Sequence, residues 1–160
     1  MTTEQTAEAF NPEVLETMTQ ELFDNKSTIA ALRGMGEDEL EAIYTLGFNA
    51  YSQGKYHDAA QTFSMLSVYN HLEPKYHKGL GACCQMLQMF PEAIQSYGAA
   101  LTLAPLDADP KLHIAECLIA IGEIDDAKEM LAYVLEEVED IGESPVRDRA
   151  NVLLDALEGI

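Results

Sequence analysis

The sequence predicts an all-α fold, a solenoid of three helix–turn–helix repeats between an N-terminal helix and a C-terminal capping helix. Two observations lead to this prediction. The 160-residue chain overlays itself when it is shifted by 34 residues, and a fixed period of this length is typical of helix–turn–helix solenoids. The chain also holds only 6 Pro and 10 Gly residues, which do not cluster, so no low-complexity linker divides it.

Five columns of the shifted sequence agree without gaps. Small residues occupy the columns where two helices would cross closely, and large apolar residues fill the crossings. Gly occupies two of three turn positions, because it readily adopts the positive φ that ends a helix. A helical bundle with chance spacing would not explain this agreement. The columns, which fit the tetratricopeptide repeat (TPR), are Gly47, Gly81 and Ala115; Gly54, Gln88 and Gly122; Tyr56, Phe90 and Ile124; Ala59, Ala93 and Ala127; and Phe63, Tyr97 and Leu131.

Residues 1–36 are expected to form an acidic segment with a helix ahead of the repeats. An Asn-Pro-Glu run from Asn11 makes a helix start, since Asn caps, Pro suits the first turn and Glu faces the positive helix end. A short turn ahead of Gly34 is expected to point Ile29 and Leu32 inward. The first helix needs a partner, either the first repeat or a second copy of the chain, for its apolar stripe of Val14, Leu15, Met18, Leu22 and Phe23.

The three repeats are expected over residues 37–140, and the capping helix over residues 141–160. Proline marks several helix starts because its fixed φ suits the first turn, and Asp109 is expected to cap one of them. The last helix would cover the open face of the last repeat, as solenoids require. The expected helices run over about 37–52, 56–69, 74–87, 91–103, 109–121, 124–139 and 145–157.

The chain is strongly acidic, with 28 acidic and 9 basic residues and a net charge of −19. Residues 1–40 hold nine acids and two bases, residues 107–160 fifteen and four, and residues 41–106 only four and three. This charge argues against nucleic acid and anionic membrane surfaces as partners, since both attract Lys and Arg. The plainer interpretation is that acidic surfaces keep a protein soluble.

The N-terminal residues are polar and acidic, so we expect no signal peptide. No apolar run approaches the length of a membrane helix, so we expect no direct membrane insertion. Three cysteines, an odd number, make no disulfide framework and favour a reducing cytoplasm. Cys83 and Cys84 are expected to be buried free thiols.

Helical periodicity predicts which residues of the first helix in each repeat line the concave face. Tyr44, Phe48 and Tyr51 form an aromatic stripe beyond the core positions of their helix. An exposed stripe of this kind favours a peptide-binding site over ordinary core packing. The full set of inner positions is Glu41, Tyr44, Phe48 and Tyr51; Lys75, Lys78, Ala82 and Gln85; and Asp109, Leu112, Glu116 and Ile119.

One familiar ligand of TPR modules is not expected. Cochaperone TPR modules grip a C-terminal carboxylate with a clamp of Lys, Asn and Arg. Lys78 lies outside the usual places of that clamp, so we expect an extended segment held in apolar pockets rather than a free C-terminus. At the matching positions this chain has Tyr44, Phe48, Gly79, Asp109 and His113.

No motif for catalysis or cofactor binding is present. The sequence holds no phosphate-binding Gly loop, no Gly-x-Ser-x-Gly and no His-Glu-x-x-His. His113, Glu116 and Cys117 lie close on one expected helix, but nothing at suitable spacing completes a metal site. We therefore expect no catalytic residue, no metal and no cofactor.

Three runs, one in each repeat, carry a family resemblance. They are Gly47–Tyr56, Lys78–Cys83 and His113–Cys117, preceded by Ser27–Leu32. They resemble the translocator chaperones of bacterial type III secretion (class II, LcrH/SycD type). The similarity covers about residues 27–135, in order and with matching spacing.

The resemblance implies a small protein of the bacterial cytoplasm that binds two hydrophobic pore-forming translocators before secretion. An extended client segment with a Pro-x-Leu-x-x-Pro-like pattern would lie in the concave groove. Family members often dimerise through the N-terminal helix, which implies a possible homodimer through Asn11–Phe23. By position, Tyr44, Phe48 and Tyr51 would match the groove aromatics, and Lys78, Ala82, Gln85, Leu112, His113 and Glu116 the rest of the groove.

Two other functions stay open at this point. A chaperone of needle subunits would hold a small helical client in the same groove. A generic TPR scaffold would join folded proteins through its convex or end surfaces. An enzyme is the weakest alternative.

Overall fold

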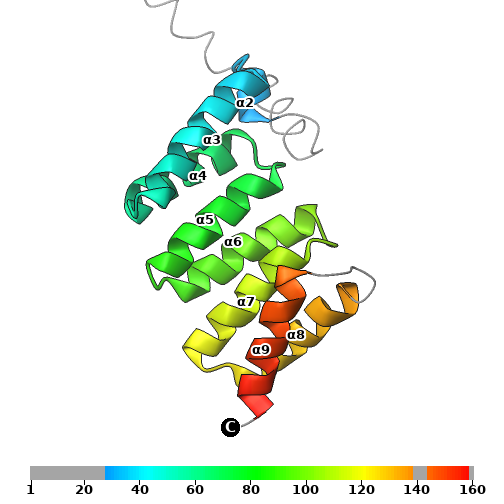
Figure 1. Cartoon of the computed structure of the whole chain (residues 1–160). Coiled ribbons are helices and arrows are strands. Elements are labelled where there is room, and N and C mark those ends of the chain that lie inside the picture. Colours follow the sequence, from blue (N-terminus) through cyan, green and yellow to red (C-terminus); the bar gives the residue numbers. More distant parts are fainter. Residues whose placement is uncertain (1–27, 139–143, 159–160) are drawn as a thin grey trace, which may run out of the picture.

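The computed structural model describes residues 28–138 and 144–158, and the helices in these ranges stack in an elongated array (Figure 1). Consecutive helices from α3 onward pack against one another, and these ranges contain no strand. The predicted helix Asn11–Phe23 and the 140/141 boundary lie outside the described residues. The helices are α2 (Ile29–Leu32), α3 (Glu37–Ser52), α4 (Tyr56–Tyr69), α5 (Pro74–Met86), α6 (Phe90–Leu103), α7 (Ala108–Ile121), α8 (Ile124–Glu137) and α9 (Pro145–Glu158).

The all-α solenoid predicted from the 34-residue period is confirmed. The alanine column Ala59, Ala93 and Ala127 is completely buried in all three repeats. The column of large residues is buried too, with Phe63 and Tyr97 exposing 2% and 1% of their surface. Each repeat therefore places the same two columns in its core, which is the physical content of the sequence period.

The small column is complementary to the large one. A Cβ on Gly47 would lie 3.1 Å from the ring of Phe63, and one on Gly81 would lie 2.9 Å from the ring of Tyr97. In the third repeat an alanine replaces the glycine at the equivalent position, and a leucine replaces the ring. Aromatic rings thus occur in the repeats where a glycine leaves room for them.

The turn column adopts the left-handed backbone conformation in all three repeats. Gly54 has a φ of 76° and Gly122 a φ of 86°. Gln88, which occupies this position in the second repeat instead of a glycine, also has a positive φ of 60°. The turn geometry is therefore kept in the second repeat although a side chain raises its energy there.

Two local predictions, one for a helix cap and one for a buried side chain, differ from the structure. Asp107 caps α7 by accepting a hydrogen bond from the Asp109 backbone amide at 3.1 Å, so the predicted cap Asp109 is wrong. The cap lies two residues earlier, and the Asp109 side chain is left for other contacts. The inward position predicted for Leu32 is also wrong, because this side chain is 41% exposed and Ala30 is buried instead.

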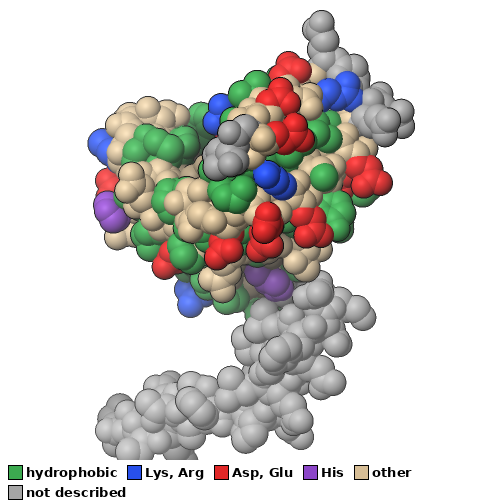
Figure 2. Space-filling view, turned by 90° about the horizontal axis from the view of Figure 1, so that it is seen from below, with side chains coloured by type: hydrophobic (Ala, Val, Ile, Leu, Met, Phe, Trp, Pro, Cys, Tyr) green, Lys and Arg blue, Asp and Glu red, His purple; other side chains and the backbone are tan. Residues whose placement is uncertain are grey.

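The C-terminal helix α9 covers the last repeat. Ala150 and Leu157 of α9 are buried in one cluster with residues of α7 and α8. The acidic excess is visible in Figure 2, which views the end of the molecule drawn at the bottom of Figure 1 and shows red side chains among green ones. Across the described ranges, no helix combines the length and apolar character needed to cross a bilayer.

Candidate functional site: a groove with an aromatic wall and a charged wall

A hollow of about 290 Å3 lies between the first helices of the three repeats. Helices α3, α5 and α7 supply most of its lining, and α4 and α6 supply one aromatic ring each. Six of the ten predicted site residues line this hollow. The lining residues are Tyr44, Phe48, Tyr51, Phe63, Lys75, Lys78, Gly79, Ala82, Tyr97, Asp109 and His113.

The first wall of the groove is aromatic. Phe48 is 55% exposed, whereas Tyr44 and Tyr51 are partly buried. The Tyr44 ring packs 5.6 Å from Phe63 between centroids, and Tyr51 meets Tyr56 edge to face at 5.3 Å. These contacts hold the two tyrosines in place, so the wall is ordered before any ligand arrives.

The floor consists of residues that sequence reasoning assigned to the helix crossings alone. Phe63 and Tyr97 are almost fully buried, yet an edge of each ring reaches the groove. Gly79 makes this approach possible, because a Cβ there would lie 2.8 Å from the Phe63 ring. Two small residues on the inner side of α5, Gly79 and Ala82, could have indicated from the sequence that buried rings reach the groove here.

The second wall carries paired charges. Lys75 Nζ lies 2.6 Å from a carboxylate oxygen of Glu41 and 4.8 Å from the centroid of the Tyr44 ring. The hydrogen bond to Glu41 raises the pKa of Lys75 above its ordinary value. Both lysines of this wall therefore stay protonated at neutral pH, since Lys78 has carboxylate partners as well.

Lys78 is held by two carboxylates at the start of α7. Its Nζ lies 2.9 Å from Asp107 and 2.9 Å from Asp109. Partial burial opposes the charge of Lys78, but the hydrogen bonds to Asp109 and Asp107 outweigh it and raise the pKa. Asp107 caps the helix with one carboxylate oxygen and contacts Lys78 with the other, so both aspartates meet the lysine.

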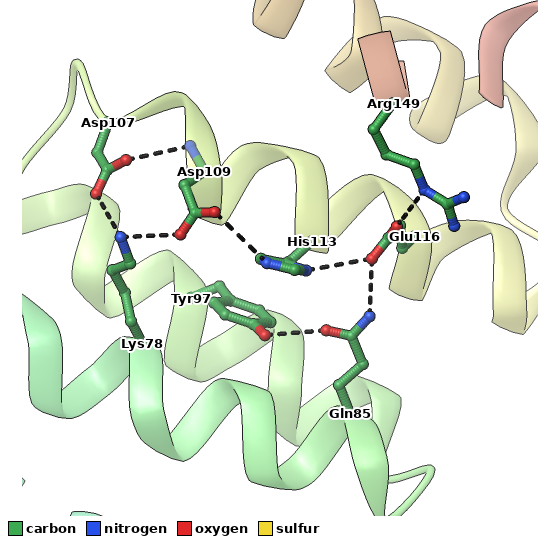
Figure 3. Close-up of polar contacts among 8 residues, drawn as sticks. All are labelled: Lys78, Gln85, Tyr97, Asp107, Asp109, His113, Glu116 and Arg149. Carbon is green, nitrogen blue, oxygen red and sulfur yellow. Dashed lines mark hydrogen bonds and ion pairs between the residues drawn. The ribbon is translucent and has the colours of Figure 1, made fainter. Parts of the chain in front are cut away.

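His113 lies between two carboxylates, as Figure 3 shows. Its Nε2 is 3.6 Å from Asp109, and its Nδ1 is 3.2 Å from Glu116. The ion pair with Asp109, followed by the hydrogen bond to Glu116, raises the pKa of His113 to about 9. The imidazole is thus a cation at neutral pH with both nitrogens engaged, so neither nitrogen is left for proton transfer.

Glu116 links the groove to two further elements. Its carboxylate accepts hydrogen bonds from Gln85 Nε2 and Arg149 Nε, each at 3.0 Å (Figure 3). Gln85 in turn accepts a hydrogen bond from the Tyr97 hydroxyl at 2.9 Å. The polar residues therefore form one continuous network from Lys78 on α5 to Arg149 on α9.

Four predicted site residues do not line the hollow: Gln85 and Glu116 belong to the polar network beside it, and Leu112 and Ile119 lie apart from it. Leu112 is only 6% exposed and belongs to the core cluster of the third repeat, together with Ala150 and Leu157 of α9. Ile119 packs against the same cluster. The prediction that Leu112 faces the groove is therefore corrected: α9 covers this side of α7, and the neighbouring His113 faces the groove.

The cysteines are buried free thiols, as predicted for Cys83 and Cys84. Burial raises the pKa of Cys83 to about 12 and the pKa of Cys117 to about 11. Thiols of this kind are poor nucleophiles, because the thiolate is the reactive form.

The arrangement is suited to binding rather than to chemical conversion. Its aromatic rings offer apolar contact area at a low entropic cost. The charged side chains of the other wall pair with one another, so they restrict the shape of the groove without presenting an unpaired charge to an apolar ligand. We conclude that the groove can accept apolar side chains from an extended chain.

Comparisons with known proteins agree with this geometry. Matches to the tetratricopeptide repeat family cover residues 40–71 and 87–141. The low calcium response locus protein H of Yersinia pestis is 35% identical over 132 residues, which cover 82% of this chain and 79% of that protein.

Two solved structures are similar along most of the chain. A T3SS complex from Aeromonas hydrophila is 32% identical with a TM-score of 0.83, covering 90% of this chain and 96% of that one. The type III secretion chaperone SycD of Yersinia enterocolitica, in complex with a peptide of the translocator YopD, is 33% identical with a TM-score of 0.71 and covers 78% and 95%. The chain therefore belongs to the LcrH/SycD-type family of translocator chaperones of bacterial type III secretion.

Proposed function

We propose that this protein is a chaperone that binds hydrophobic type III secretion translocators through an extended client segment in the groove described above. The observation that carries the proposal is the preformed aromatic wall of Tyr44, Phe48 and Tyr51 over a floor of Phe63 and Tyr97. The YopD peptide bound by SycD supports a translocator segment as the ligand. This function requires no catalysis and belongs in the bacterial cytoplasm, before the client is secreted.

The mechanism is a shift of equilibrium. A translocator carries apolar segments that aggregate when they are exposed, and a chaperone that binds them lowers the concentration of the exposed form. Each large apolar side chain that enters the groove contributes roughly 1.5–3 kcal/mol. Ordering the client and losing its free motion offset much of this gain. The resulting affinity is moderate, which allows release at the secretion apparatus.

The test is a titration with a dye-labelled peptide that carries the Pro-x-Leu-x-x-Pro pattern. We expect saturable binding to the wild type and a loss of at least about tenfold in affinity for Tyr44→Ala/Tyr51→Ala, since tenfold corresponds to only 1.4 kcal/mol. Tyr133→Ala is the matched control, because Tyr133 is a half-exposed tyrosine on α8, outside the groove. Circular dichroism verifies that helical content is unchanged in each variant.

Two other outcomes would contradict either the proposed ligand or the proposed site. Failure of the wild type to bind at high micromolar concentration would contradict this ligand and favour a needle-subunit client or a folded partner. Equal losses in the tyrosine pair and in Tyr133→Ala would show that the groove is not the site. Because the charged side chains of the groove pair with one another and the client would contact the aromatic wall, the affinity should depend only weakly on salt.

A further inference from the structure

A second groove lies on the other side of α5, away from the site described above. Leu80 and Cys84 of α5 and Leu87 directly after it line this groove, whereas Lys78 and Ala82 face the first groove. Residues at spacings of three and four share one face of a helix, so the two sets lie on different faces. The second groove is therefore a separate surface, and its occupant need not be the client of the first.

The second groove is larger and mainly apolar. It has a volume of about 590 Å3, and Met65, Val68 and Met89 in its lining are 42%, 58% and 41% exposed. Adjacent apolar side chains with this exposure mark a surface that another chain segment covers. The lining residues on α4 form one continuous stripe at helical spacing, made up of His57, Ala60, Gln61, Ser64, Met65, Val68 and Tyr69.

The described chain begins beside one end of this groove. Helix α2 packs on α4, and the guanidinium of Arg33, directly after α2, lies 6.0 Å from the ring centroid of Tyr69. Tyr69 lines the second groove at the carboxyl end of α4. From Thr28 back to Phe23 there are five residue steps, which span at most about 18 Å. The apolar stripe predicted for Asn11–Phe23 is thus within reach of the groove.

The length of the N-terminal segment also agrees with the length of the second groove. A helix over the 13 residues Asn11–Phe23 would be about 20 Å long. The stripe on α4 from His57 to Tyr69 covers twelve residue steps, or about 18 Å. We propose that the chain's own segment Asn11–Phe23 docks as a helix in the second groove, with Phe23 near Tyr69 and Val14 toward His57. It would cover the apolar surface that α4 of the first repeat shares with Leu80, Cys84, Leu87 and Met89 of the second.

The protein offers a clean probe for this contact, because it contains no Trp. Met18→Trp places a single indole in the middle of the apolar stripe, and Gln20→Trp places one on the polar side of the same segment. In the full-length chain we expect emission at shorter wavelength from Met18→Trp than from Gln20→Trp. Equal emission at the long wavelength of a solvated indole would overturn the proposal.

Groove variants decide whether the contact is the proposed one. Adding Met65→Glu or Val68→Glu to Met18→Trp should return its emission to longer wavelength, whereas Val152→Glu, at a 60% exposed valine on α9, should not. These positions are exposed, so the fold should survive, and circular dichroism checks that it does. An emission unaffected by both groove variants, or changed equally by Val152→Glu, would contradict docking at this place.

Dilution separates the chain's own segment from that of a second copy. An emission that stays constant over a wide range of protein concentration supports docking within one chain. A shift to longer wavelength on dilution would assign the groove to a second copy and overturn the proposal. Peptide binding in the aromatic groove should be unchanged by Met65→Glu, so failure of this inference and failure of the proposed function are separate results.

Discussion

The rings of Tyr97 and His113 stack with their planes 13° apart and their centroids 5.2 Å apart. Tyr97 is buried in the crossing of the second repeat, and His113 belongs to the first helix of the third repeat. The stack therefore joins the core of one repeat to the groove surface of the next. Because Asp109 and Glu116 also hold the imidazole, His113 connects packing, charge and groove shape in one residue.

The first prediction concerns the pH dependence of stability. The pKa of His113 is raised from 6.5 to about 9, first by the ion pair with Asp109 and then by the hydrogen bond to Glu116. The folded state therefore binds this proton more tightly than the unfolded state does. The resulting stabilisation is fully present below pH 6.5 and is lost as the pH rises through about 9. The difference in Tm between wild type and His113→Gln should shrink across that range, and a constant difference would contradict the assignment.

The second prediction compares two partners in the polar network. Arg149→Ala removes one ion pair with a half-exposed arginine and should cost less than about 1 kcal/mol of unfolding free energy. Glu116→Ala leaves His113, Gln85 and Arg149 without their shared acceptor and should cost about 1–3 kcal/mol. Urea unfolding of the two variants measures the order. An equal cost would mean that Glu116 acts mainly through α9.

The third prediction concerns the turn of the second repeat. Gln88 has a φ of 60°, where a side chain is strained and glycine is not. Gln88→Gly should stabilise the protein by about 0.5 kcal/mol, since relief of strain exceeds the entropy that glycine adds to the unfolded chain. The control is Gly54→Ala, which should destabilise because Gly54 has a φ of 76°. Chemical denaturation reports both, and destabilisation by Gln88→Gly would contradict the strain argument.

The fourth prediction tests the complementarity of the two core columns. Gly81→Ala would bring a Cβ to 2.9 Å from the Tyr97 ring, and overpacking of this kind costs about 1–3 kcal/mol. The double variant Gly81→Ala/Tyr97→Leu copies the Ala–Leu pair of the third repeat. Its cost should be smaller than the sum of the two single costs by about 1 kcal/mol. Additive costs in the double-mutant cycle would show that the two positions do not compete for space.

Much of the fold could be predicted from the sequence because each repeat solves the same packing problem. Ala59, Ala93 and Ala127 recur at the helix crossings, and the helices α3 and α4 have the bounds expected from composition and periodicity. The aromatic wall of Tyr44, Phe48 and Tyr51 could also be predicted from the sequence, since other residues of the same helix were assigned to its core positions. These features are local or repeat at a fixed spacing, so a linear pattern carries them.

The tertiary structure decided what each inner position faces. Leu112 stands one period after Lys78, yet Lys78 lines the groove and Leu112 is buried. The reason lies in the helix that follows each repeat: α7 meets this face with the carboxylates of Asp107 and Asp109, which pair with Lys78, whereas α9 contributes apolar Ala150 and Leu157 to the cluster that buries Leu112. The contact between α5 and α7 likewise decided that Asp109 pairs with Lys78, while Asp107 caps α7. The period thus determined the scaffold of this protein, and the contacts between elements distant in sequence decided the shape and charge of its groove.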